Sequence, residues 1–135
     1  MPETSLSPED VQLFGAKNFA HVSTLREDGS PHATVVWVDQ ADGRVRFNSA
    51  ERSVKVKHLR RDPRVAVSVH AQDDPYRAVT ILGTATLSTD GAEEHIDELT
   101  RKYTDMDRYP SDWRAPGEVR VKIEVTPLSI LRYGY

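Results

Sequence analysis

The end of the chain alternates strictly between apolar and polar side chains. Apolar residues at every second position from 119 to 125 alternate with Arg120, Lys122, Glu124 and Thr126. This is the period of a strand with one buried face. The pattern continues past Pro127 through Leu128–Tyr133, so the sequence predicts one long strand near the C-terminus.

Two Asp-Gly turns organise the strands of the first half. Apolar runs at residues 19–25 and 31–38 flank the turn at Asp28-Gly29, which is the pattern of a β-hairpin. A second turn at Asp42-Gly43 joins the 31–38 run to a strand over Arg44–Asn48. We expect these three strands to form an antiparallel meander.

Two further runs rich in β-branched residues complete the expected sheet, at Arg64–His70 and Tyr76–Leu87. Gly83 inside the second run predicts a bulge or a tight bend. Six strands joined by turns, with few helices, predict a mainly β protein in the form of a small six-stranded antiparallel barrel. We expect residues 1–135 to form a single domain.

Helix-capping patterns predict three helices. Ser7-Pro8 opens a short helix that Gly15 ends. Asn48 or Ser49, with Glu51, predicts the start of a basic helix that Asp62-Pro63 ends. Asp90-Gly91-Ala92-Glu93 predicts a capping box before a helix whose apolar face comprises Ala92, Ile96, Leu99 and Tyr103.

Composition excludes several classes of function. The chain has no cysteine, so disulfides, thiolate metal sites and cysteine nucleophiles are excluded. A net charge of −3 argues against general nucleic-acid binding. The polar stretch from Met1 onward contains no signal peptide or membrane span, and we expect a soluble, cytoplasmic protein.

Basic residues concentrate in one segment, Arg44–Arg64, which contains eight of the eighteen Lys and Arg residues against two acids, Glu51 and Asp62. A strand that leads into a helix start offers free backbone N–H groups and the positive end of the helix dipole to an anion. The hydroxyls of Ser49 and Ser53 and the ammonium of Lys55 add donors there. The alternative is an amphipathic surface helix with solvated charges.

Other familiar catalytic signatures are missing from the sequence. There is no GxSxG elbow, no GxGxxG turn and no Walker loop. The five histidines show no metal-binding spacing, and we expect no metal site. An anion site without a protein nucleophile suits a phosphorylated cofactor that carries out the chemistry.

Three segments carry a resemblance to a known family: LREDGSPHATVVW, RVRFNSAERSVKVKHLRRDPRVAV and YRAVTILGTATL. They resemble the flavin-binding split-barrel superfamily named after pyridoxamine 5′-phosphate oxidase. More narrowly, they resemble its deazaflavin-dependent oxidoreductases, which use coenzyme F420. His58 stands where that branch commonly has Asn.

The resemblance implies a split barrel that forms a homodimer, with two cofactors at the subunit interface and a small-molecule substrate. It implies hydride transfer from reduced coenzyme F420 to a small conjugated substrate, and it names no catalytic residue. Lys55 is the first position that it assigns to the cofactor phosphate, whereas Tyr76 and Arg77 are assigned to the partner's cofactor. The implied cofactor-binding residues are Ala33, Thr34, Val35, Val36, Trp37, Arg46, Asn48, Ser49, Ser53, Lys55, Tyr76 and Arg77.

Three alternatives remain open at this point. An FMN-dependent oxidase or reductase would keep the fold and change the cofactor, because FMN offers a phosphate to the same helix start. A non-catalytic protein that carries F420 or flavin would keep the site without the reaction. Packing in the barrel or at an interface would account for Trp37, Tyr76 and Arg77 without any cofactor.

Overall fold

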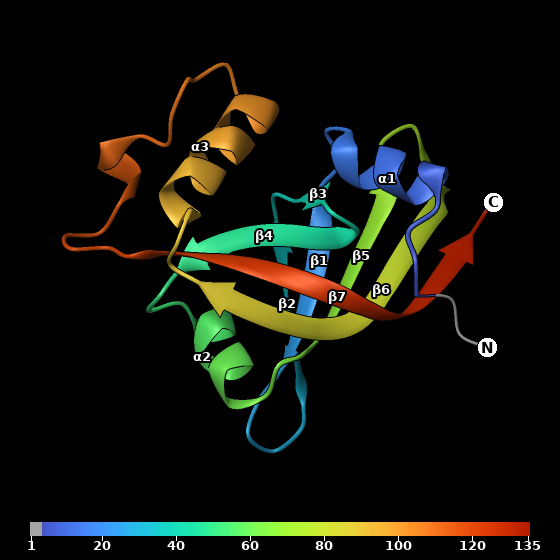
Figure 1. Cartoon of the computed structure of the whole chain (residues 1–135), viewed down its shortest axis with the longest axis horizontal. Helices are drawn as coiled ribbons and strands as arrows, with labels where there is room; N and C mark the ends of the chain where they lie inside the picture. Colours follow the sequence, from blue (N-terminus) through green and yellow to red (C-terminus); the bar gives the residue numbers. More distant parts are fainter. Residues whose placement is uncertain (1–3) are drawn as a thin grey trace.

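The computed structural model describes residues 4–135, so the first three residues of the polar N-terminal stretch lie outside the described part. Within these described residues, seven strands form one antiparallel sheet in the order β2-β1-β5-β6-β7-β4-β3 (Figure 1). The strands are β1 (Ala20–Leu25), β2 (Pro31–Val36), β3 (Asp39–Ala41), β4 (Arg44–Ala50), β5 (Arg64–Ala71), β6 (Asp74–Ser88) and β7 (Arg120–Tyr133). The helices are α1 (Pro8–Gly15), α2 (Val54–Arg61) and α3 (Ala92–Tyr103), with a 3₁₀ turn over Ser111–Trp113. None of the helices in residues 4–135 is long and apolar enough to cross a membrane.

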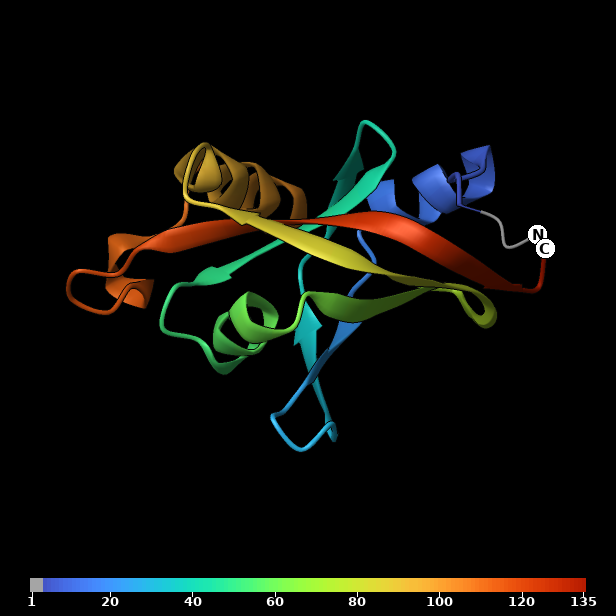
Figure 2. The same ribbon diagram turned by 60° about the horizontal axis from the view of Figure 1, so that its bottom comes forward.

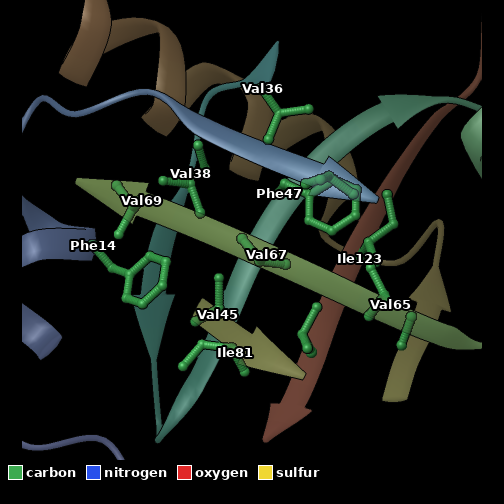
Figure 3. Packing of buried hydrophobic residues seen from close by; sticks show 14 of the residues in the cluster. Phe14, Val36, Val38, Val45, Phe47, Val65, Val67, Val69, Ile81 and Ile123 are labelled. Atoms are coloured by element: carbon green, nitrogen blue, oxygen red, sulfur yellow. The ribbon is translucent and has the colours of Figure 1, made fainter. Parts of the chain in front are cut away.

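The sheet curls around a core of aliphatic side chains and two phenylalanines. Figure 3 shows Phe14 from α1 and Phe47 from β4 among valines of β4 and β5, with Ile81 and Ile123 facing them. Every second residue of β7 from Val121 to Val125 is fully buried, as the alternating sequence pattern predicts. The apolar face predicted for α3 is also buried.

Seven strands replace the predicted six, and the predicted meander is wrong. β2 ends at Val36 and the chain resumes as β3, which lies at the opposite edge of the sheet. Val38, between them, takes its backbone partners from α3: its N–H donates to the Tyr103 hydroxyl at 3.2 Å, and its carbonyl accepts from Lys102 Nζ. Because these side chains satisfy the backbone of Val38, the strand pairing is interrupted there.

The turn at Asp42-Gly43 therefore joins β3 to β4 rather than β2 to β4. The other predicted hairpin is confirmed, because β1 and β2 pair in register from Ala20↔Val36 to Leu25↔Pro31. The bulge predicted at Gly83 is confirmed by a register shift between Leu82 and Gly83 where β6 pairs with β7.

The N-terminus of the basic helix lies further along the chain than predicted. Asn48 and Ser49 continue the ladder of β4 with β7, and α2 begins after Ser53, whose side chain accepts from the Val56 N–H at 3.3 Å. Lys55 therefore lies in the first turn of α2.

The other two predicted caps differ in outcome. The capping box of α1 is confirmed, because Ser7 and Asp10 exchange side-chain and backbone hydrogen bonds. At α3 the N-cap is Gly91, in the left-handed conformation (φ 73°), and no side chain forms a capping hydrogen bond. The capping box predicted there is therefore wrong.

Candidate functional site

Strand β4 passes between α3 and α2 (Figure 2). Side chains from this part of the fold line a pocket of about 330 Å³. It brings together five of the residues implied by the resemblance: Val35, Val36, Trp37, Asn48 and Lys55. The remaining lining residues are Phe19, Ile96, Leu99, Tyr109, Trp113 and Arg120. The pocket therefore combines an apolar and aromatic wall with two cationic side chains.

Lys55 is the first of these cations. Its side chain is half-buried, and within residues 4–135 its ammonium has no hydrogen-bond or ion-pair partner. Burial lowers the pKa of Lys55 from its usual value, and the nearby charge of Arg120 lowers it further. A half-buried ammonium without a counter-ion favours an anionic ligand, because the ligand would supply the missing charge.

Arg120, the second cation, is 8% exposed. Its Nε donates to Asn48 Oδ1 at 2.9 Å and its Nη1 donates to Glu118 Oε2 at 3.1 Å. The guanidinium also lies over the ring of Tyr109, 4.9 Å from its centroid. Glu118 balances part of the charge of Arg120, so the pocket keeps a net positive charge through Lys55.

Aromatic side chains line the pocket beside these cations. Trp37 and Tyr103 stack with their ring centroids 5.4 Å apart and their planes 5° apart, and Phe19 lies against Tyr103 at 5.3 Å. Tyr109 and Trp113 meet edge to face at 5.6 Å. Tyr103 is buried beneath this wall, whereas the flat rings of Trp37, Tyr109 and Trp113 line the pocket and suit a planar ligand.

The segment that holds Tyr109 and Trp113 is fastened to α3. Arg114 forms a bidentate ion pair with Glu93, at 2.6 and 3.0 Å, and Asp97 accepts from the backbone N–H of Tyr109 at 2.9 Å. These contacts position the aromatic wall over the start of β7, where Arg120 lies.

Three predicted site residues lie near the pocket without lining it. Ser49 Oγ donates to Ser53 Oγ at 2.8 Å, so these hydroxyls pair with each other at the start of α2. Arg46 is engaged by carboxylates: it binds Asp39 through two 2.8 Å hydrogen bonds and Glu98 at 3.3 Å. A cofactor role for these three stays a prediction.

Ala33 and Thr34 lie on β2, before the pocket residue Val35. Ala33 is exposed, whereas Thr34 Oγ1 is a buried polar atom that has no hydrogen-bond partner within residues 4–135. A buried hydroxyl without a partner costs folding free energy. A cofactor contact of Ala33 and Thr34 stays a prediction.

Tyr76 and Arg77 lie away from this pocket, at the start of β6. Tyr76 is 69% exposed and its ring lies 6.2 Å from that of Tyr133. Arg77 lines a wider, open hollow of about 530 Å³ beneath α1. These two residues do not join Lys55 within one chain, so their predicted contact with a partner's cofactor stays a prediction.

Sequence reasoning missed Arg120 as a pocket residue, because the alternating pattern assigns it to the polar face of a strand. Tyr109 and Trp113, which the sequence offers as aromatic residues of an open substrate side, do line the pocket. Their signal was the cluster Tyr109-Pro110-Ser111-Asp112-Trp113, in which two aromatics stand in a polar stretch.

A model of the pyridoxamine 5′-phosphate oxidase family matches residues 6–130. The chain belongs to this family. The match confirms the resemblance to the flavin-binding split-barrel superfamily. It extends the likeness well beyond the three segments that carried it in the sequence.

Several solved structures resemble the chain over most of its length. An F420 reductase shares 25% identity at a TM-score of 0.77, over 89% of this chain and 94% of its own. A conserved hypothetical protein from Mycobacterium tuberculosis shares 21% sequence identity at a TM-score of 0.75, over 96% of this chain and 86% of its own. General Stress Protein 26 from Bacillus anthracis shares 17% sequence identity at a TM-score of 0.67, over 90% of this chain and 88% of its own. The last two inform the fold alone.

Proposed function

We propose that this protein is an oxidoreductase that binds coenzyme F420 in the pocket of Lys55 and Arg120 and reduces a small, conjugated organic substrate. The half-buried ammonium of Lys55, which has no partner in residues 4–135, is the observation that carries the proposal. Family membership and the likeness to an F420 reductase support it.

The residues of the pocket fit the parts of such a cofactor. Lys55 and Arg120 would hold its phosphate by charge-assisted hydrogen bonds. Trp37, Tyr109 and Trp113 offer flat surfaces to a planar ring system, and Val35 and Val36 offer apolar contacts. When bound in its reduced form, the deazaflavin supplies a hydride to the substrate, which also takes up a proton.

The protein's own contribution would be binding and orientation. The apolar wall formed by Ile96 and Leu99 excludes water from one side of the pocket. The cations fix the anionic part of the cofactor, so the reacting ring is held at a constant position. Rate enhancement then comes from near-attack positioning.

FMN is the alternative cofactor, because its phosphate suits the same two cations and the family match does not distinguish the two molecules. An F420 or flavin carrier is the alternative function, because binding alone requires the same pocket. Both alternatives keep Lys55 and Arg120 as the anion site.

We also propose that two copies of the chain pair through the outer face of β6 and β7. Leu82, Leu131 and Tyr133 lie on that face and are 41%, 56% and 64% exposed. Exposed apolar residues that lie together on a sheet face mark an interaction surface. A second copy is the proposed occupant because Tyr76, beside Tyr133, extends the same surface and has no role in its own chain's pocket.

The first experiment is a parallel titration of the purified protein with oxidised F420 and with FMN. The chain has two tryptophans, Trp37 and Trp113, and both line the pocket, so quenching of their emission reports binding at this site. Trp37→Phe and Trp113→Phe, measured separately, assign the quenching to each wall. We expect tighter binding of F420.

A turnover assay then separates an enzyme from a carrier. Reduced F420 is mixed with the protein and a panel of conjugated carbonyl compounds and quinones, and oxidation of the cofactor is followed by absorbance. An enzyme reduces at least one acceptor faster than the protein-free control, whereas a carrier binds the cofactor and reduces none. Binding of neither cofactor would overturn the proposed function.

A further inference from the structure

The side chain of Asn48 is buried beside Arg120 and makes hydrogen bonds with both ends of its amide. Its Nδ2 donates to the Ala92 carbonyl at 3.0 Å and approaches His95 Nδ1 at 3.2 Å. Its Oδ1 accepts from Arg120 Nε at 2.9 Å. The Ala92 carbonyl can only accept, so this contact fixes which end of the amide faces Arg120.

The same argument determines which ring nitrogen of His95 carries the proton. Asn48 presents an N–H to His95 Nδ1, so Nδ1 accepts and carries no proton. The other ring nitrogen, Nε2, then carries the proton and donates to Asp39 Oδ1 at 3.2 Å. The side chain of His95 is only 1% exposed, so no water competes for these contacts.

A continuous series of matched donors and acceptors thus runs from Asp39 through His95 and Asn48 to Arg120. Asp39 itself is held by two hydrogen bonds from Arg46. The series begins at the edge strand β3, crosses α3 and β4, and ends at the cation beside Lys55.

We propose that Asn48 and His95 are positioning residues that hold the Arg120 guanidinium in place for the cofactor phosphate. This inference rests on the proposed function, because it assumes that the pocket binds a phosphorylated cofactor. It assigns to Asn48 an indirect role, since Ala92, His95 and Arg120 already occupy its amide. It assigns to His95 the role of orienting that amide.

The geometry explains why Arg120 requires such support. Its ion-pair partner, Glu118, lies two residues before it on the chain and accepts from Nη1 at 3.1 Å. Without the hydrogen bond from Nε to Asn48, the guanidinium would be free to turn while it keeps its ion pair with Glu118. It would then lose its fixed orientation toward the pocket. The loss would weaken phosphate binding and leave contacts with the ring system unchanged.

The test uses the phosphate preference, which is the ratio of the dissociation constants of a phosphate-free ligand and its phosphorylated form. The ligand pair is the ribityl deazaflavin core of F420 and its 5′-phosphate, or riboflavin and FMN if the first titration selects FMN. A positioning role for Asn48 predicts that Asn48→Ala lowers this ratio by about tenfold. Binding of the phosphate-free ligand should change by less than about twofold.

Two substitutions of His95 separate its two contacts. The side-chain oxygen of Asn overlies the Nδ1 position and would still accept from Asn48, whereas the amide of Gln overlies Nε2 and would still donate to Asp39. We expect His95→Asn to keep most of the phosphate preference and His95→Gln to lose it. Thermal melting of each variant monitors folding.

The outcomes distinguish the inference from the function. If the wild-type protein shows no phosphate preference, the proposed function fails. If the wild type shows it and the Asn48→Ala and His95→Gln variants retain it, the function stands and the inference is overturned. Equal weakening of both ligands in folded variants would also overturn it, because that is the effect of a disrupted pocket.

Discussion

Asp10 and Arg132 lie 122 residues apart in the sequence and form a buried ion pair, with Nη2 2.6 Å from Oδ2 and Nε 3.0 Å from Oδ1. Asp10 is fully buried in α1, and Arg132 lies near the end of β7. Tyr135 also donates its hydroxyl to Asp10. The pair therefore fastens the first helix to the last strand.

Asp10→Asn should lower the free energy of unfolding by about 2 to 3 kcal/mol, because it removes a charged partner of Arg132 in a buried setting. Urea denaturation followed by circular dichroism measures the change. Glu9→Gln is the matched control, since Glu9 is an exposed neighbour in the same helix and should change the stability by less than about 0.5 kcal/mol. Equal effects of the two substitutions would contradict this account.

The same ion pair predicts a dependence of stability on pH. Burial alone would raise the pKa of Asp10, but hydrogen bonds from Arg132, Tyr135 and Ser7 outweigh it and lower the pKa below 3.8. The contribution of Asp10 is therefore complete above pH 3.8 and is lost as the pH falls through the lowered folded-state value. Urea midpoints measured over this acid range should fall more steeply for the wild type than for Asp10→Asn.

Lys55→Ala should weaken binding of the phosphorylated cofactor by about 10- to 100-fold, which corresponds to the loss of one charge-assisted hydrogen bond. Fluorescence titration measures the affinity. Lys57→Ala is the matched control, because Lys57 lies on the same helix but is exposed and outside the pocket. An unchanged affinity in folded Lys55→Ala would remove this residue from the site.

Gly83→Ala should destabilise the barrel by about 2 kcal/mol, because the added Cβ would lie 2.3 Å from the carbonyl oxygen of Thr126 in the neighbouring strand. Thermal unfolding measures the loss. Gly15→Ala, where nothing lies within 4 Å of the added Cβ, should leave the melting temperature unchanged or slightly raised. A neutral Gly83→Ala would mean that the strands separate at the bulge without cost.

Leu131→Glu should convert a dimer into a monomer, because it places a charge on the apolar outer face of β6 and β7. Size-exclusion chromatography with light scattering measures the mass of the wild type and the variant. Val119→Glu serves as the control, since Val119 is 49% exposed just before β7 begins, away from that face. A wild-type mass of one chain would refute the pairing itself.

Elements defined by neighbouring residues were predicted well from the sequence. The Ser7-Pro8 start of α1, the hairpin at Asp28-Gly29 and the bulge at Gly83 all agree with the structure. Each depends on backbone conformation or on hydrogen bonds within a few residues. The position of Lys55 on a basic helix is of the same kind, although the cap lies at Ser53.

The strand predictions that failed depend on residues far apart in the sequence, whereas the capping box expected before α3 failed locally, because Gly91 is the N-cap there. The strand predicted through Val38 is interrupted because Tyr103 and Lys102, from α3, satisfy its backbone. No pattern around Val38 contains that information. The extra edge strand β3 and the loss of the meander follow from the same long-range contacts.

Arg120 shows most clearly what the sequence decides and what the tertiary structure decides. Its place in the alternating pattern determines that it lies on the polar face of β7, and this is correct. An alternation with a period of two shows on which face of the strand a residue lies. It does not show whether another element packs over that face. In the folded protein, α3 and the segment with Tyr109 and Trp113 pack over this end of β7, so Arg120 is 8% exposed beside Lys55. The sequence by itself determined the strand and its charge, and only the tertiary structure made that charge part of a pocket.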